Sequence, residues 1–196
     1  MDSTPVDVHP LHPITQTFEF VVLPPPRATQ GRILSPPLIA RVLFPDTGLE
    51  HYSKQEMVTA MATCISRDNQ MVDPKGEPVP LKGTVLCQGR KLEDYPHVQQ
   101  VLEQYDVNGY HWVYFAFPGM TLELWGRWRI RLIIQIWNVA QLSQRQGPVE
   151  LGGFETHEFE VVTEDTPIVA PTPEQARYMN QLRTLGGPGF GNIPSA

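Results

Sequence analysis

Arginine is the residue type whose spacing in this chain could do chemistry. Arg127, Arg129 and Arg131 stand at every second position, which would place them on one face of a β-strand. Such a row could bind phosphates, because a guanidinium group matches phosphate geometry. The alternative is a solvated strand face whose arginines pair with carboxylates of a neighbouring strand, such as Glu158 or Glu160. Alternation alone already predicts polar residues there, so it favours the solvated, paired face.

Two further arginines, Arg27 and Arg32, lie in the proline-rich segment LPPPRATQGRILSPP. Binding residues are often carried on loops that a rigid scaffold positions, so this pair is a candidate anion contact. Two arginines in a loop of fifteen residues are also ordinary, and on their own they favour solvated side chains. The acidic pairs Glu93-Asp94 and Glu164-Asp165 are likewise expected in loops, as solvated surface.

The sequence carries no recognisable catalytic or metal-binding motif. None of its six histidines is spaced from a cysteine or carboxylate as metal ligands are, for example in CxxC or HxxxH. Nucleophile elbows, phosphate-binding glycine loops and dinucleotide fingerprints are also absent. Cys64 and Cys87 are expected in two strands, as buried thiols rather than an inter-sheet disulfide. We therefore expect no enzymatic activity, no cofactor, no metal and no small-molecule substrate.

Composition narrows the class further. The chain has 196 residues, a net charge of −6 and a pI near 5.5, so nucleic-acid binding would need a local basic patch. Its length suits one core. No apolar run reaches the roughly 20 residues that span a bilayer, and residues 1–13 lack the apolar stretch of a secretory signal. The missing signal and the two cysteines favour an intracellular protein that does not enter a membrane.

The arginine row belongs to the stretch WVYFAFPGMTLELWGRWRIRLIIQIW, residues 112–137. This stretch predicts two long strands joined at Pro118-Gly119, which form a hairpin at the centre of a β-sandwich. The residues that alternate with the arginines are apolar and are expected to face the core: Trp128, Ile130, Leu132, Ile134 and Ile136. Trp137 is out of phase with this face, which indicates either a sheet edge or a partner surface.

The remaining strands must build a scaffold around this stretch. They are expected over residues 17–22, 38–44, 55–66, 81–88 and 154–162. The segment 55–66 also has the propensity for a helix, but its alternating Val58, Ala60, Ala62 and Cys64 favour a strand. Loops link the strands at 23–37, 68–80 and 141–153.

Two short helices complete the expected fold. One lies within residues 93–105, and the other covers 174–185, with Thr172 as its N-cap, Pro173 at its first position and Gly186-Gly187 at its end. The sequence thus predicts a mainly all-β, immunoglobulin-like antiparallel β-sandwich with one or two short helices, including a C-terminal one. The domain would span residues 14–186, with flexible tails at 1–13 and 187–196.

Three blocks of the chain carry a resemblance to a known family. They are FEFVVLPPPRATQGRILSPPLIARVLF, then LKGTVLCQGRKLED, then the stretch 112–137, in which Phe115-Ala116-Phe117-Pro118 and Gly126-Arg127-Trp128-Arg129 are followed by Arg131. In this order they resemble the velvet domain family of fungal regulatory proteins, whose third block reads Y-F-x-F-P-D-L and then G-R-[YF]-R-L-R-F. The tail HEFEVVTEDTPIVAPTPEQARYMNQLRTLG is similar to the family's closing strand, linker and terminal helix. The resemblance covers about residues 17–186, and its specificity comes from order and spacing together.

The resemblance implies a fold related to the Rel homology region of transcription factors. It also implies a nuclear regulator of fungal development, sporulation and secondary metabolism, which forms homo- or heterodimers with other velvet proteins and binds double-stranded DNA. The DNA contacts would come from the loop before the PP-aliphatic strand, here Arg27 and Arg32, with Arg90 and Lys91 as neighbours. Because no basic nuclear-import run is visible, import is expected to depend on a partner, and the chain is expected in the cytoplasm as well.

This loop is less basic than the family's. Thr29 and Gly31 stand at basic positions, while Ser35 and Gly119 replace the aspartates of D-P-P and F-P-D. Losing two phosphate contacts would flatten the dependence of DNA affinity on salt by roughly two units, because each contact contributes about −0.9. A second interpretation is therefore a heterodimer subunit that acts mainly through protein–protein contacts. A third, an immunoglobulin-like adhesion module, is disfavoured by the missing secretory signal.

Overall fold

The computed structural model describes residues 17–45, 56–66, 81–91, 110–138, 147–184 and 190–195. In these ranges the chain is mainly β and has one helix. The alternating sequence patterns predicted this fold class. The strands are β1 (Phe18–Val22), β2 (Arg27–Thr29), β3 (Leu38–Pro45), β4 (Glu56–Ser66), β5 (Leu81–Lys82), β6 (Leu86–Gln88), β7 (Arg90–Lys91), β8 (Tyr110–Phe117), β9 (Thr121–Leu122), β10 (Gly126–Asn138), β11 (Val149–Glu155) and β12 (Phe159–Val162). The helix is α4 (Pro173–Thr184).

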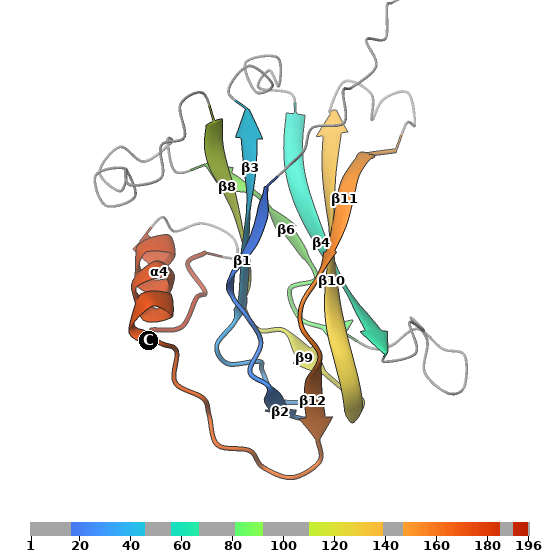
Figure 1. Ribbon diagram of the computed structural model, residues 1–196, viewed down its shortest axis with the longest axis vertical. Coiled ribbons are helices and arrows are strands. Elements are labelled where there is room, and N and C mark those ends of the chain that lie inside the picture. Colours follow the sequence, from blue (N-terminus) through green and yellow to red (C-terminus); the bar gives the residue numbers. More distant parts are fainter. Residues whose placement is uncertain are drawn as a thin grey trace, which may run out of the picture.

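Most strands belong to two sheets, which Figure 1 shows running along the long axis of the molecule. One sheet has the order β1-β3-β8-β7, and all of its pairs are antiparallel. The other has the order β2-β12-β10-β4-β6, with β11 also paired to β10. Its β2–β12 pair is parallel, so this sheet is mixed rather than antiparallel throughout. A small third sheet joins β5 to β9.

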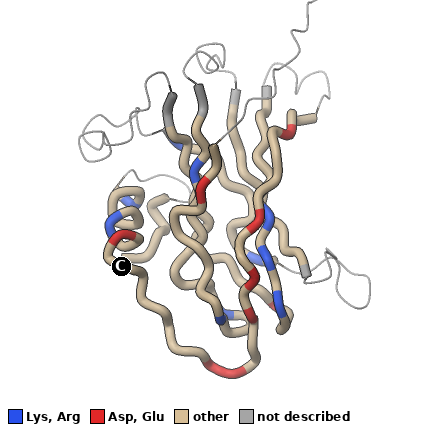
Figure 2. Tube along the Cα trace, viewed as in Figure 1, with Lys and Arg blue, Asp and Glu red and all other residues tan. Residues whose placement is uncertain are grey.

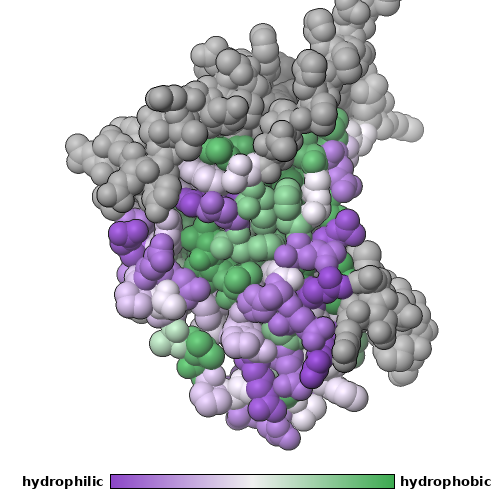
Figure 3. Space-filling view, viewed as in Figure 1, coloured by the Kyte–Doolittle hydropathy of each residue, from purple (hydrophilic) through white to green (hydrophobic). Residues whose placement is uncertain are grey.

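The two large sheets share one hydrophobic core. The apolar face predicted for residues 128–136 is confirmed, since every second side chain from Trp128 to Ile136 is at most 5% exposed. Four of these side chains belong to one cluster with Phe115 and Phe117 of β8 in the other sheet, namely Trp128, Ile130, Leu132 and Ile134. Phe18 of β1 stacks on Phe154 of β11 with ring centroids 3.9 Å apart. Figure 3 shows apolar residues gathered on the middle of the visible face of the molecule. Burial between the sheets therefore fixes which face of each strand turns inward.

The predicted central hairpin is wrong. The strands β8 and β10 lie in different sheets, and residues 118–125, which include β9, carry the chain from one sheet to the other. β8 pairs with β3, while β10 pairs with β4 over eleven residue positions. Alternation identifies the two faces of a strand but not its neighbours, and here the longest ladder joins strands far apart in sequence.

Four other features differ from expectation. The strand predicted over 81–88 is two short strands, β5 and β6, because Gly83 has φ +92° and its backbone lies against Gly119. The strand predicted over 154–162 is interrupted at Thr156, whose amide donates to the carbonyl of Ile130 and whose hydroxyl accepts from the Ile130 amide. β11 also begins at Val149, inside the segment predicted as a loop, and β2 lies inside the proline-rich loop.

The strands predicted over 17–22, 38–44 and 55–66 are confirmed as β1, β3 and β4. The N-cap of the C-terminal helix is confirmed as well. Thr172 Oγ1 accepts from the Gln175 amide at 3.2 Å, and Gln175 Oε1 accepts from the Thr172 amide at 2.9 Å, which is a capping box. The expected helix within 93–105 and the helix end at Gly186-Gly187 lie outside the described residues. In the described part, no helix is long and apolar enough to cross a membrane.

Candidate nucleic-acid interface

The first candidate pair, Arg27 and Arg32, lies at one end of the mixed sheet, where β2 runs beside β12 (Figure 1). Both side chains are exposed, at 55% and 65%. They line a groove of about 600 Å³ together with Ile33, Leu34 and Ile168. Ile33 and Ile168 are themselves exposed, at 62% and 80%, which is unusual for large aliphatic side chains. The two arginine side chains therefore border a groove with exposed apolar residues.

Backbone hydrogen bonds hold this loop on the sheet. The Glu160 amide donates to Pro26 O at 2.9 Å, and the Gln30 amide donates to Val162 O at 2.8 Å, one at each end of β2. The Gly31 amide donates to Leu122 O at 2.7 Å. Gly31 has φ +70°, a backbone conformation that residues with a side chain disfavour. The expected rigid presentation of Arg27 and Arg32 thus has a physical basis, because the loop backbone is bonded to two neighbouring segments.

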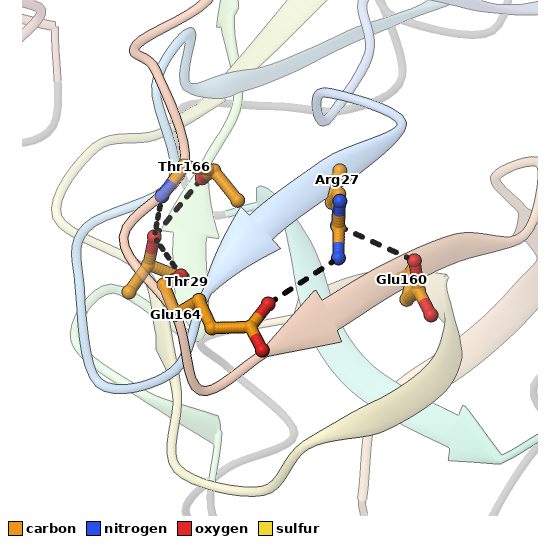
Figure 4. A network of polar contacts seen from close by, with 5 residues as sticks. All are labelled: Arg27, Thr29, Glu160, Glu164 and Thr166. Carbon is orange, nitrogen blue, oxygen red and sulfur yellow. Dashed lines mark hydrogen bonds and ion pairs between the residues drawn. The ribbon is translucent and has the colours of Figure 1, made fainter.

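Carboxylates of β12 and the turn after it surround both arginines. Arg27 Nε lies 3.5 Å from Glu160, and Arg27 Nη2 lies 3.6 Å from Glu164 (Figure 4). Arg32 Nη2 lies 2.9 Å from Asp165. Three carboxylates and two guanidinium groups leave a local charge of −1. Glu164 and Asp165 are exposed as the sequence indicated, but they are paired with arginines more than 130 positions away in the chain.

These two arginines and three carboxylates form what we call the corner: Arg27, Arg32, Glu160, Glu164 and Asp165. A pair of threonines lies at the same corner. The Thr166 amide donates to Thr29 Oγ1 at 3.0 Å, and the two hydroxyl oxygens lie 2.9 Å apart (Figure 4). Thr29 Oγ1 also lies 3.4 Å from the carbonyl of Glu164. The segment that carries the carboxylates is therefore held to β2 both by ion pairs and by a hydroxyl clasp, which we define as Thr29 and Thr166.

The structure does not bring the other two candidates, Arg90 and Lys91, to this corner. They form β7, which pairs with β8 and directly follows β6, the strand at the far edge of the mixed sheet from β2. The Nε atom of Arg90 is buried, and no described residue bonds it. Arg90 and Lys91 would therefore meet DNA only as a second, separate contact.

In the row Arg127, Arg129 and Arg131, the first two arginines follow the paired alternative, whereas the buried Nε of Arg131 has no hydrogen-bond partner among the described residues. Arg127 lies 3.4 Å from Glu158, and Arg129 pairs with Glu155. Figure 2 shows these basic and acidic residues side by side where β11 and β12 run along β10. Arg131 lies across Gly153 so closely that a Cβ there would come 2.8 Å from its Nε. Of the two expected carboxylate partners, Glu158 pairs with the row, whereas Glu160 pairs with Arg27.

The two cysteines behave as predicted. Both are buried and free rather than joined in a disulfide. Burial raises the pKa of Cys64 to about 12. Burial also raises the pKa of Cys87, to about 11, although a backbone hydrogen bond at Ala116 and the charge of Arg90 lower it. Both thiols are thus protonated at neutral pH and are poor nucleophiles. Within the described ranges, no cluster of His, Cys, Asp and Glu could hold a metal ion.

For Trp137 the sequence indicated either a sheet edge or a surface that contacts a partner. Its indole Nε1 donates to Thr59 Oγ1 at 3.0 Å, on the neighbouring strand β4, and its side chain is half-buried. Trp128 fills the core, as expected. The tryptophan that reasoning from sequence missed is Trp125, which is 70% exposed in the connection between the sheets.

Comparison with known proteins adds no assignment. No protein-family model matches the chain, and no curated protein matches its sequence.

Proposed function

We propose that this chain is a velvet-type transcriptional regulator, which acts in the nucleus as one subunit of a homo- or heterodimer on double-stranded DNA and controls fungal development, sporulation and secondary metabolism. The finer fold, an immunoglobulin-like sandwich related to the Rel homology region, is part of this proposal. What supports it is the arrangement of two sheets around one core, with a basic loop presented at one end. In that fold class, loops at the end of the sheets are the usual binding surface.

The observation that carries the proposal is the joint exposure of Arg27 and Arg32 on a backbone that hydrogen bonds hold in place. Guanidinium groups on a fixed loop can contact phosphates without a large loss of conformational entropy. A dimer would place two such loops along one duplex, as dimeric DNA-binding proteins do.

A second function is favoured by a specific observation. The carboxylates of Glu160, Glu164 and Asp165 outnumber the two arginines, and the groove beside them exposes Ile33 and Ile168. A surface with net negative charge and exposed aliphatic side chains suits a protein partner better than DNA. The chain would then be a heterodimer subunit that acts mainly through protein–protein contacts.

A DNA titration separates the two functions. The intact chain is titrated against duplex DNA at 50 and 200 mM salt, alone and with a candidate velvet-family partner. The same titrations are then repeated with the double variant Arg27→Ala plus Arg32→Ala. A matched control, Arg177→Ala, removes one exposed arginine from α4. The loop proposal predicts weaker binding and a flatter salt dependence for the double variant only.

The alternative outcomes are equally definite. If the double variant binds with the affinity and salt dependence of the parent, Arg27 and Arg32 do not contact DNA. If binding appears only with the partner and is unaffected by the double substitution, the chain is a protein-binding subunit.

A further inference from the structure

The segment between β12 and α4, residues 163–172, contains Thr166, to which neither proposed function gives a role. It contains neither helix nor strand, and most of its residues are exposed, with Ile168 at 80%. Glu164, Asp165 and Thr166 tie it to β2 and to Arg32 through ion pairs and a hydrogen bond. A segment held by two exposed ion pairs and one part-buried clasp opens locally at a small free-energy cost.

Thr166 lies within this segment and is followed by Pro167 in the order Thr-Glu-Asp-Thr-Pro. A Thr-Pro dipeptide in an extended, exposed segment is the kind of sequence that proline-directed protein kinases modify. Independently of this sequence, Thr166 lies close to the arginine pair. Its hydroxyl oxygen is 2.9 Å from Thr29 Oγ1, and Thr29 lies between Arg27 and Arg32 in the chain. Both arginines and Thr166 line the same groove.

We propose that Thr166 is the phosphoacceptor of a proline-directed protein kinase and that its phosphate switches off the arginine pair; the effect on DNA rests on the proposed function. The kinase transfers the γ-phosphoryl group of ATP to Thr166 Oγ1. A new P–O ester bond forms, the bond between the β- and γ-phosphates breaks, ADP leaves, and the hydroxyl proton passes to solvent. The step needs no redox partner.

The clasp must change once the ester exists. Thr166 Oγ1 then has no hydrogen to donate, while Thr29 Oγ1 already accepts from the Thr166 amide at 3.0 Å. The Thr29 hydroxyl, which can also donate to the Glu164 carbonyl at 3.4 Å, is left as the donor, and the phosphate oxygens become competing acceptors. The hydrogen-bonding role of Thr29 is thereby fixed, and the segment is anchored by the phosphate rather than by a shared hydroxyl hydrogen.

The phosphate also changes the charge of the corner. It adds roughly −1.5 to −2 at neutral pH beside Arg27 and Arg32, where three carboxylates already face two guanidinium groups. Phosphate accepts bidentate bonds from arginine and repels Glu164 and Asp165, so it competes for both guanidinium groups. Arginines engaged in this way are withdrawn from the phosphates of DNA.

The first test is modification of the intact chain. The full-length protein is incubated with ATP and a purified proline-directed kinase, and the phosphate is located by tandem mass spectrometry. The chain offers internal comparisons, since Thr4, Ser35 and Thr172 also precede proline. We expect phosphate at Thr166, its loss in Thr166→Val, and its retention in Thr163→Val. No phosphate at Thr166, or phosphate only at the other three positions, overturns the proposal.

The second test asks whether the phosphate reaches the arginines. Phosphorus-31 NMR measures the second pKa of phosphothreonine in the phosphorylated chain and in phosphorylated Arg27→Gln plus Arg32→Gln. Nearby guanidinium groups favour the dianion, so this pKa is expected to lie roughly 0.5 unit lower in the parent. Equal pKa values in the two proteins would overturn the switch, whether or not the chain binds DNA.

The third measurement connects the switch to DNA. Phosphorylation is expected to weaken duplex binding roughly tenfold at 50 mM salt, the loss expected for about one phosphate contact. If the unmodified chain binds no DNA at all, the proposed function fails, while the NMR comparison still decides the switch. If the unmodified chain binds DNA and phosphorylation leaves its affinity unchanged, the switch is wrong and the proposed function stands.

Discussion

Under the proposed function, removing two of the three carboxylates that face Arg27 and Arg32 is expected to strengthen DNA binding. The perturbation is Glu164→Gln with Asp165→Asn, which preserves shape but removes the partners at 3.6 Å from Arg27 and 2.9 Å from Arg32. Two carboxylates are lost, so the local charge changes from −1 to +1. Each freed guanidinium group can then displace counterions from a DNA phosphate.

The magnitude follows from counterion release. Each added phosphate contact contributes about −0.9 to the slope of log affinity against log salt, so two contacts contribute about −1.8. Raising the salt fourfold, from 50 to 200 mM, would therefore weaken the variant about twelvefold more than the parent. Stability should change little, because exposed ion pairs contribute at most about 1 kcal/mol each.

The assay is fluorescence anisotropy of a labelled duplex at several salt concentrations, with thermal unfolding as a check on the fold. A matched control is Glu155→Gln with Glu158→Gln, which removes two carboxylates from the Arg127 and Arg129 row. If parent and variant show the same salt slope, the carboxylates do not shield the arginines. If the control steepens the slope as much, the effect is one of overall charge and the assignment of the interface to Arg27 and Arg32 is refuted.

Three further predictions concern the scaffold. Thr172→Ala removes the N-cap bond to Gln175 and should lower the free energy of unfolding in urea by about 1 kcal/mol, whereas Thr172→Ser should retain most of it. Gly83→Ala should lower it by more than the roughly 1–3 kcal/mol of a strained backbone, because φ is +92° and the new Cβ would meet the Gly119 carbonyl; equal urea midpoints would contradict that packing. Cys64 and Cys87, with pKa values raised by burial to about 12 and about 11, should resist a thiol reagent at pH 8 until the chain is unfolded, and rapid labelling of the native protein would contradict their burial.

Much of the fold could be predicted because hydrophobic periodicity is local. The alternation from Trp128 to Ile136 identified the buried face of β10, and the Thr-Pro-Glu-Gln sequence at 172–175 identified the start of α4. Each of these signals lies within a few residues, so it does not depend on the rest of the chain. The choice of strand over helix for 55–66 depended on similar alternation and was also confirmed.

Pairing between strands could not be predicted in the same way. β10 carries a ladder to β4, which lies more than sixty residues earlier, and Pro118-Gly119 begins a crossing between sheets rather than a hairpin turn. The breaks at Gly83 and Thr156 depend on Gly119 and Ile130, which are distant in sequence. Tertiary contacts decide these features, and a pattern read along one segment does not contain them.

The candidate interface shows the same division. The family resemblance pointed to Arg27 and Arg32, but only the parallel pairing of β2 with β12 places Arg27 opposite Glu160. The backbone bonds that hold the loop rigid are therefore the same bonds that bring carboxylates to its arginines. At Glu160 the rigidity of the loop and the neutralisation of its arginine cannot be separated. The Glu160 backbone holds the loop, and its side chain pairs with Arg27.

They can be separated at Glu164 and Asp165, which lie beyond the end of β12 in a segment without regular structure. Moving this segment leaves the β2–β12 ladder intact, so it would free Arg32 and leave Arg27 with Glu160 alone while the loop keeps its position. With only Glu160 remaining, two guanidinium groups would face one carboxylate and the local charge would become +1. The sign of the charge at this corner thus depends on whether residues 163–166 stay attached to β2, and under the proposed function that sign decides between DNA and a protein partner.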